Sequence, residues 1–538
     1  MDRSEAAPIP ATALSPFRYP IFRAVWVANV LASLGTFIES VGASWLMLSI
    51  APSADMVALV QASIALPTML LSLAAGALAD NYDRRRVMLG ADFFMLAVSI
   101  TLAVCAWTGA ITPWFLLLLT FLLGCGSAFS GPAWQAAVGD MVPRKELPGA
   151  VTLNSVAFNI ARSVGPAIGG AIVAAAGAAV AFTVNAVCYI PMIGVLARWR
   201  SPERSQALPR EPLGVAIAAG IRYVWMSPAI LSVLLRSLVF GIGASGLMAL
   251  MPLVAKVLLG GGPLVYGLML GAFGVGAVGG AVSSSKLRGA LSTETIVRWA
   301  CVVSSFATAI AAVSNWLPIT MAGLVLAGAG WVLALTTFNV SVQLNAPRWV
   351  VARALSIYQM AAFGGIAGGS WIWGVVASQG GVTPSLLMCA IVLLGCAALG
   401  TLQPLEQSRA LDLGPLRQWQ EPETAVAVNS RTGPVVITIE YLIREADQLR
   451  FLAAMSERRR IRRRDGALNW RLLRDLANPE LWIERYETPT WLEYLRLNSR
   501  MTQNDADIPE SLRALHQGAG PPQVRRMIER PAVRPDAD

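Results

Sequence analysis

A succession of long apolar segments between residues 21 and 402, separated by short polar loops, constrains this chain more than any other feature. A helix needs about 20 apolar residues to cross a hydrocarbon core of about 30 Å, because each residue adds about 1.5 Å. About twelve segments meet this requirement. The first three quarters of the chain therefore read as an all-α membrane protein with twelve transmembrane helices.

Composition narrows the functions that such a chain can have. Only 14% of the residues are charged and 55% are hydrophobic, which does not fit a soluble protein. The six cysteines lie in apolar segments without a CxxC pair, and His516 is the single histidine. No lysine follows a glycine, so a nucleotide-binding P-loop is absent. We expect no metal, no cofactor, no nucleic-acid partner and no enzymatic activity in the membrane part.

The loops alternate in charge, which predicts the orientation. One set carries nearly all the basic residues of the membrane region: Arg3, Arg18, Arg23, Arg84, Arg85, Arg86, Arg144, Lys145, Arg198, Arg200, Arg204, Arg210, Arg222, Lys286, Arg288, Arg348 and Arg353. The loops near residues 51–56, 109–112, 177–180, 314–316 and 380–383 carry none, and Lys256 is the exception. By the positive-inside rule, both termini are expected in the cytoplasm.

The longest connection in the membrane region, residues 198–222, divides the spans into two sets of six. This division favours two related halves with a substrate site between them, although hydropathy alone also fits twelve spans without a repeat. The expected organisation is a cytoplasmic N-terminal segment (1–20), a first half (21–200), a cytoplasmic linker (201–226), a second half (227–403), a second linker (404–432) and a cytosolic domain (433–538).

The loop after the second span contains a recognisable string. Gly76, Asp80, Arg84 and Arg85 match the major facilitator signature G-x-x-x-D-[RK]-x-G-[RK]-[RK], whereas Asn81 and Asp83 depart from it. The string thus resembles that superfamily, in which the motif braces the two halves on the cytoplasmic side and gates the transporter. The alternative is an ordinary basic cytoplasmic loop.

The fifth span carries Gly165, Pro166, Gly169 and Gly170. A proline kinks a helix, and glycines four apart permit close helix packing, so these residues are candidates for gating. The string resembles the end of the antiporter signature of drug-exporting major facilitators, which implies export. Generic close packing is the alternative. Gly364–Gly369 of the eleventh span repeats the glycines without the proline.

A wider string, Pro132 to Gln135 with Val142, Pro143 and Asn159 to Arg162, resembles the enterobactin-exporter branch of the superfamily. The resemblance covers about residues 15–405. It implies a secondary exporter of metabolites, siderophores or drugs, with multidrug resistance or siderophore export as its role.

Charges inside the spans mark candidate transport residues, because a charged side chain facing lipid costs at least about 2.5 kcal/mol. Glu39 is the candidate for proton coupling, and Arg162 is its candidate partner or an anion ligand. A structural Glu39–Arg162 brace without a transport role is the alternative. The fourth span lacks a coupling arginine, which leaves facilitated efflux open. The remaining candidates are Gln135, Asn154, Asn159 and Arg236, with Asp92 noted only as a further charge.

The last hundred residues no longer contain long apolar segments. Val435–Ile443, Ala467–Asp475, Leu481–Glu487 and Gln523–Arg530 read as strands, and Ala446–Arg460 and Thr490–Met501 read as helices. This order predicts a ferredoxin-like α+β domain. The string from Arg464 to Arg500 resembles the antibiotic-biosynthesis-monooxygenase type of dimeric α/β barrel, but Tyr494 stands where histidine is expected. A regulatory or dimerising module is favoured over a membrane-tethered monooxygenase.

A dense basic block spans Arg458 to Arg464. A solvated helix face is favoured, with contact to anionic lipid headgroups as the alternative.

The sequence thus predicts a multi-pass exporter of a small molecule in a bacterial cytoplasmic (inner) membrane. Proton coupling and dimerisation through the C-terminal domain are left open. Solute uptake, and a membrane scaffold or sensor acting through the C-terminal domain, are the rival functions.

Overall fold

The computed structural model describes residues 14–51, 53–143, 146–200, 213–347, 349–405 and 421–530. The chain forms two compact units. The first comprises residues 1–210, 232–341 and 355–407, and the second comprises residues 211–231, 342–354 and 408–538.

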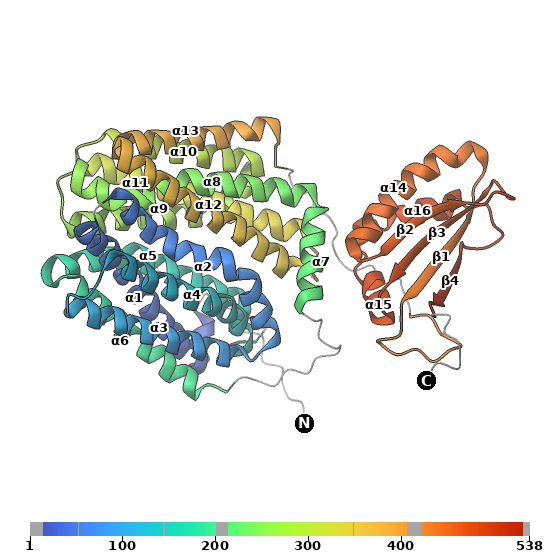
Figure 1. Ribbon diagram of the computed structural model, residues 1–538, viewed down its shortest axis with the longest axis horizontal. Helices are drawn as coiled ribbons and strands as arrows, with labels where there is room; N and C mark the ends of the chain where they lie inside the picture. The colour runs from blue at the N-terminus through green and yellow to red at the C-terminus, as the bar shows by residue number, and fades with distance from the viewer. Residues whose placement is uncertain are drawn as a thin grey trace, which may run out of the picture. The chain divides into compact units, whose positions relative to one another are not determined.

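Twelve helices of the described residues are long and apolar enough to cross a membrane, which confirms the predicted spans. They are α1 (Pro20–Ile50), α2 (Ala54–Asn81), α3 (Arg84–Trp107), α4 (Pro113–Met141), α5 (Leu147–Ala176), α6 (Ala178–Arg198), α8 (Pro228–Leu253), α9 (Pro263–Ala290), α10 (Thr293–Val313), α11 (Leu317–Asn345), α12 (Val351–Gly380) and α13 (Val382–Leu402). A π-helical segment, Val254–Leu258, continues α8. The helices form one bundle (Figure 1).

Equivalent helices pack alike in the two halves, as expected for a repeat. A Cβ atom added at Gly165 or Gly169 of α5 would meet Phe37 or Ile38 of α1 within 3.0 Å. In the second half, a Cβ atom at Gly369 of α12 would meet Ile242 of α8 at 2.7 Å. Because glycine has no Cβ, both pairs of helices approach closely.

The turns between the last two helices of each half also correspond. Gly177 lies between α5 and α6 with φ of +82°, and Gly381 lies between α12 and α13 with φ of +90°. Glycine adopts this left-handed backbone without a steric penalty, so the chain can reverse within one residue at both places.

The C-terminal part of the second unit is a four-stranded antiparallel sheet in the order β2-β3-β1-β4, the ferredoxin-like order. Its elements are β1 (Val435–Leu442), α14 (Gln448–Asp465), β2 (Leu468–Arg474), β3 (Leu481–Thr488), α15 (Trp491–Ser499), α16 (Asp507–Leu515) and β4 (Gln523–Ile528). The three helices lie against one face of the sheet (Figure 1), where apolar residues such as Ile437, Phe451 and Tyr486 form the core. The predicted strands and fold class are confirmed.

Helix α14 corrects the prediction of a solvated face for half of the basic block: Arg459, Arg460 and Arg463 are exposed, as predicted, but the other three arginines are buried. Arg458, Arg462 and Arg464 are 7%, 5% and 8% exposed, respectively. Arg458 and Arg462 point at Glu484 of β3, with nitrogen–oxygen distances of 3.3 and 3.5 Å. An arginine every four residues follows one helix face, and here that face meets an inward-facing carboxylate. Two elements were not predicted: α16, and α7 (Leu213–Trp225), which lies within the expected linker.

Candidate functional site

A cavity of about 750 Å³ lies among the helices of the first half. Five helices line it: α1, α3, α4, α5 and α6. Its polar lining includes Asn29, Ser33, Thr36, Asp92, Ser127, Ser130, Gln135, Asn154, Ser155, Asn159 and Tyr189, and its aromatic lining includes Phe37, Trp134 and Phe158. The lining positions fall mostly in the part of each helix that is nearer the basic loops. The cavity therefore belongs to that side of the bundle.

Two carboxylates are buried at or beside the cavity. Asp92, which lines it, is 3% exposed, and Glu39 is 4% exposed. Asp92 Oδ2 and Glu39 Oε1 have no hydrogen-bond partner among the described residues. Because an unpaired buried charge is costly, the arrangement suits groups that exchange a proton or bind a cation.

The structure brings three predicted residues together in the cavity wall, namely Gln135, Asn154 and Asn159. Asn159 Nδ2 donates a hydrogen bond to Ser155 O at 2.8 Å, whereas Asn154 Oδ1 has no partner within the described part of the chain. These amides can therefore offer both donors and acceptors to a bound molecule.

The structure does not bring Glu39 and Arg162 together. No ion pair joins them in the described ranges, and the Arg162 guanidinium instead lies over the Phe158 ring, 5.5 Å from its centroid. The alternative of a Glu39–Arg162 brace is thus not the arrangement found. Neither residue is part of the cavity lining.

Arg236 has a structural partner that the sequence did not reveal. Its two terminal nitrogens lie 3.3 and 3.4 Å from the Glu294 carboxylate of α10. Glu294 also accepts a hydrogen bond from the Leu405 backbone N at 3.0 Å. Arg236 thus fastens α8 to α10 and lies outside the lining of this cavity, and its transport role stays a prediction.

The arginines of the loop motif brace the first half internally. Arg84 Nη1 lies 3.1 Å from Asp140 Oδ2 and also donates to the Ala136 carbonyl, both on α4. Arg85 donates to the last carbonyls of α6, those of Leu196 and Ala197, at 2.7 and 2.8 Å. Guanidinium groups satisfy the free carbonyls that every helix C-terminus leaves.

Contact with the other half comes from small residues of α2. Ser72 Oγ donates to the Ser356 carbonyl of α12 at 3.2 Å, and a Cβ atom at Gly76 would lie 3.2 Å from Ser356 Oγ. Asp80 belongs to α2, but its side chain lies outside the described residues. Among the described residues of this motif, Gly76 therefore contacts the other half, and the brace by Asp80 stays a prediction.

Helix α5 forms the second contact between the halves. A Cβ atom at Gly170 would lie 2.7 Å from the Pro263 carbonyl of α9, and one at Gly267 would lie 2.5 Å from the Pro166 carbonyl. Backbone thus meets backbone on the side of the helix that carries Pro166 and Gly170. The neighbouring side, with Gly165 and Gly169, packs on α1. The G-P-x-x-G-G string places small residues on both sides of α5.

Replacing Gly267 by alanine is expected to separate α5 from α9 and to lower both thermal stability and transport. The added methyl group would meet backbone atoms that cannot rotate away, and such overpacking costs about 1–3 kcal/mol. Gly279 of the same helix is the matched control, because a Cβ atom there meets nothing within 4 Å. Melting in detergent and flux in vesicles measure both variants. Equal behaviour of the two would contradict this account of the interface.

No group of three or more His, Cys, Asp or Glu residues that could hold a metal ion occurs in the described part of the chain.

Comparison with known proteins finds a matching family and several relatives. The sequence profile of a family described as transmembrane secretion effector matches residues 11–533. The staphyloferrin A transporter of Staphylococcus aureus is 33% identical over 165 residues, which cover 30% of this chain and 41% of that protein. The chain thus spans less than half the length of this relative.

A second relative aligns over nearly its whole length. The multidrug efflux pump Tap of Mycolicibacterium fortuitum is 26% identical over 398 residues, covering 72% of this chain and 96% of that protein. Among solved structures, a bacterial homologue of the human lysosomal transporter Spinster is similar, with a TM-score of 0.60 and 16% identity. That similarity covers 73% of this chain and 98% of the other, and it concerns the fold.

Proposed function

This chain belongs to the transmembrane secretion effector family of the major facilitator superfamily, and from that premise we propose that it exports a small organic molecule by alternating access. The observation that carries the proposal is the cavity of about 750 Å³ in the first half, with Asp92 in its wall. The chain is a multi-pass membrane protein with a transporter fold.

The lining favours a neutral or cationic amphiphile as substrate. Trp134, Phe158 and Phe37 offer apolar faces, and the amides of Gln135 and Asn154 offer hydrogen bonds. No lysine or arginine occurs among the lining residues, which all belong to the described ranges. A cavity of this size suits a drug-sized molecule. The relative named as a multidrug efflux pump supports this substrate class more directly than the staphyloferrin A transporter does.

The charge pattern of the loops supports the direction. If the basic loops face the cytoplasm, both termini are cytoplasmic and the cavity lies on the cytoplasmic side of a bacterial inner membrane. A cavity on that side can collect substrate from the cell interior. The G-P-x-x-G-G string of α5 and the name of the efflux-pump relative also favour export.

Proton coupling is proposed to run through Asp92, with Glu39 behind it. A cationic substrate and a proton would compete for Asp92, which is the usual requirement for exchange. One charge moving down a potential of about 100 mV yields about 2.3 kcal/mol, which supports roughly a 50-fold substrate gradient.

Inverted membrane vesicles test the proposal. Vesicles that contain the protein should accumulate a lipophilic cationic dye when a proton gradient is applied, and a protonophore should release it. An anionic citrate-type siderophore should not accumulate. Accumulation of the siderophore alone would overturn the substrate class, and accumulation only in right-side-out vesicles would overturn the direction.

A further inference from the structure

The second unit contains a seam between the C-terminal domain and two other segments, helix α7 and residues 342–354. Two aromatic side chains meet there: the rings of Tyr223 and Trp349 contact edge to face, with centroids 5.6 Å apart. The Tyr223 hydroxyl also donates to the Asn345 carbonyl at 3.3 Å. Together these residues form an aromatic corner between α7 and the connection from α11 to α12.

Two arginines of the C-terminal domain stack on this corner. The Arg464 guanidinium lies 5.5 Å from the Tyr223 ring centroid, and the Arg500 guanidinium lies 4.5 Å from the Trp349 ring centroid. Arg222 adds a hydrogen bond from Nε to the Arg464 carbonyl at 3.4 Å. A guanidinium over an aromatic face is an attractive contact, and it is stronger where water is excluded. Arg464 and Arg500 are 8% and 5% exposed, respectively.

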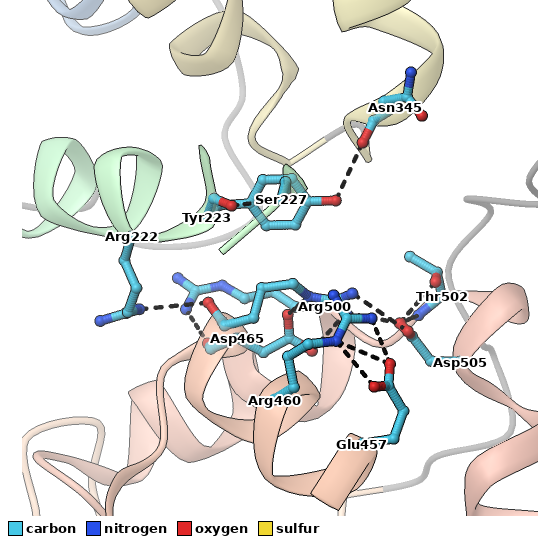
Figure 2. Close-up of polar contacts among 11 residues, drawn as sticks. Arg222, Tyr223, Ser227, Asn345, Glu457, Arg460, Asp465, Arg500, Thr502 and Asp505 are labelled. Atoms are coloured by element: carbon cyan, nitrogen blue, oxygen red, sulfur yellow. Dashed lines mark hydrogen bonds and ion pairs between the residues drawn. The ribbon is translucent and has the colours of Figure 1, made fainter. Parts of the chain in front are cut away.

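Both arginines are held in place from within their own domain. Arg464 is bound by Asp465 at 2.9 Å and by Asp505 at 2.7 Å. Arg500 Nη1 donates to the Asp465 carbonyl at 2.7 Å. Asp505 is fixed in turn by Thr502, whose hydroxyl donates to it at 2.7 Å. Figure 2 shows this network around Asp465, Arg500 and Asp505. The edges of the guanidinium groups are thus occupied, while their flat faces are presented to the aromatic rings.

Gly466 allows the approach. It ends α14 with φ of +124°, and a Cβ atom there would lie 3.2 Å from both Arg222 Nη2 and Arg500 Nη1. The chain therefore leaves no side chain at the point where the arginines of α7 and of the domain meet.

We propose that this seam is an intramolecular docking site, by which the C-terminal domain is held to α7 and to residues 342–354 within the second unit. Helix α7 leads directly into α8 at Pro228, and residues 342–354 join α11 to α12. The domain thus contacts α7, which precedes α8, and residues 342–354, which include the first turn of α12.

Hydrogen exchange of the full chain in detergent tests the docking. The variant Tyr223→Ala with Trp349→Ala removes the aromatic corner but leaves every residue of the domain intact. Amide exchange at residues 462–467 and 500–505 should rise roughly tenfold, the loss expected for two cation–π contacts. Exchange in β1 and β3 should stay unchanged, because the core of the domain is untouched.

Trp225→Ala is the matched control, because Trp225 lies on the same helix and is 77% exposed. It should leave the exchange of both segments unchanged. Arg500→Ala, which acts from the other side, should raise exchange in residues 219–225 and 349–354. Unchanged exchange on both sides of the seam, or an equal rise with Trp225→Ala, would overturn the proposal.

Discussion

Vesicles carrying Asp92→Asn are expected to lose uphill accumulation of substrate by roughly tenfold or more, while the protein remains folded. Asp92 is 3% exposed in the cavity wall, and its Oδ2 has no partner among the described residues. A carboxylate kept in such a place destabilises the fold unless it is protonated or binds a cation. Asparagine keeps the shape and removes the charge, so stability should hold or rise.

Glu39→Gln separates the two roles assigned to the acids. Glu39 lies outside the cavity lining, so its loss should impair proton-driven accumulation and spare downhill exchange of substrate. Asp92→Asn should impair both, because Asp92 would also contact the substrate. Asp55→Asn, in the first turn of α2 and outside the lining, controls for loss of an acidic residue elsewhere. An Asp92→Asn protein that accumulates substrate with unchanged pH dependence would rule out the coupling role.

The largest expected effect on stability comes from Glu484→Gln in the C-terminal domain. Glu484 is fully buried, and Arg458, Arg462, Trp470 and Tyr441 all donate to or pair with its carboxylate at 3.0–3.5 Å. The substitution leaves two buried arginines without their counter-charge. Breaking a buried ion pair in this way costs about 3–5 kcal/mol. In a domain of about 100 residues this lowers the melting temperature by roughly 10 °C or more.

The pH dependence of the same domain follows from the pKa of Glu484. Burial alone would raise this pKa, but Arg458, Arg462 and the hydrogen bond from Trp470 hold it below its ordinary value. A carboxyl group whose pKa is lowered in the folded state contributes stability above its unfolded pKa of about 4.3. That contribution is lost as the pH falls through the folded pKa. The wild-type domain should therefore lose this stability in acid, and Glu484→Gln should lack that part of the dependence.

Hydrogen exchange of β1 and β3 in the full chain measures this stability. Glu487→Gln, on the opposite face of the same strand, is the control and should have little effect. Replacing Glu484 by leucine together with Arg458 and Arg462 by methionine should restore part of the loss, because it removes all three buried charges of this cluster. If the triple variant is no more stable than Glu484→Gln, unpaired charge is not the cause.

The sequence predicts the membrane fold well because hydropathy reports burial in lipid directly, one segment at a time. The strands of the C-terminal domain can be predicted for a similar reason. Inward-facing residues such as Trp482, Glu484 and Tyr486 alternate with outward-facing ones, and this alternation is visible within a few consecutive residues. Gln135, Asn154 and Asn159 could be proposed as cavity residues because amides are rare in apolar spans. Asp92 was not among the predicted transport residues, although its charge in an apolar segment was visible; its place in the cavity wall came only from the structure.

Pairings between distant residues could not be predicted. Glu294 meets Arg236 across 58 positions, and nothing near Arg236 marks that partner. The same holds for Arg458 and Arg462 of the basic block, because their burial depends on Glu484 of a strand that follows α14. A run of arginines in a sequence does not show whether the side chains pair with a buried carboxylate or face water.

The cavity has a consequence for energy conversion. All the lining residues, each within the described ranges, come from the first half. A ligand shifts an equilibrium only by binding one state more tightly than the other. A solute that is bound by one half alone contacts nearly the same atoms in the inward-facing and the outward-facing state. Its binding therefore favours neither state of the transporter. If the cavity holds the transported solute as proposed, the bias would come from a group whose charge differs between the two states, and Asp92 in the cavity wall is the proposed group.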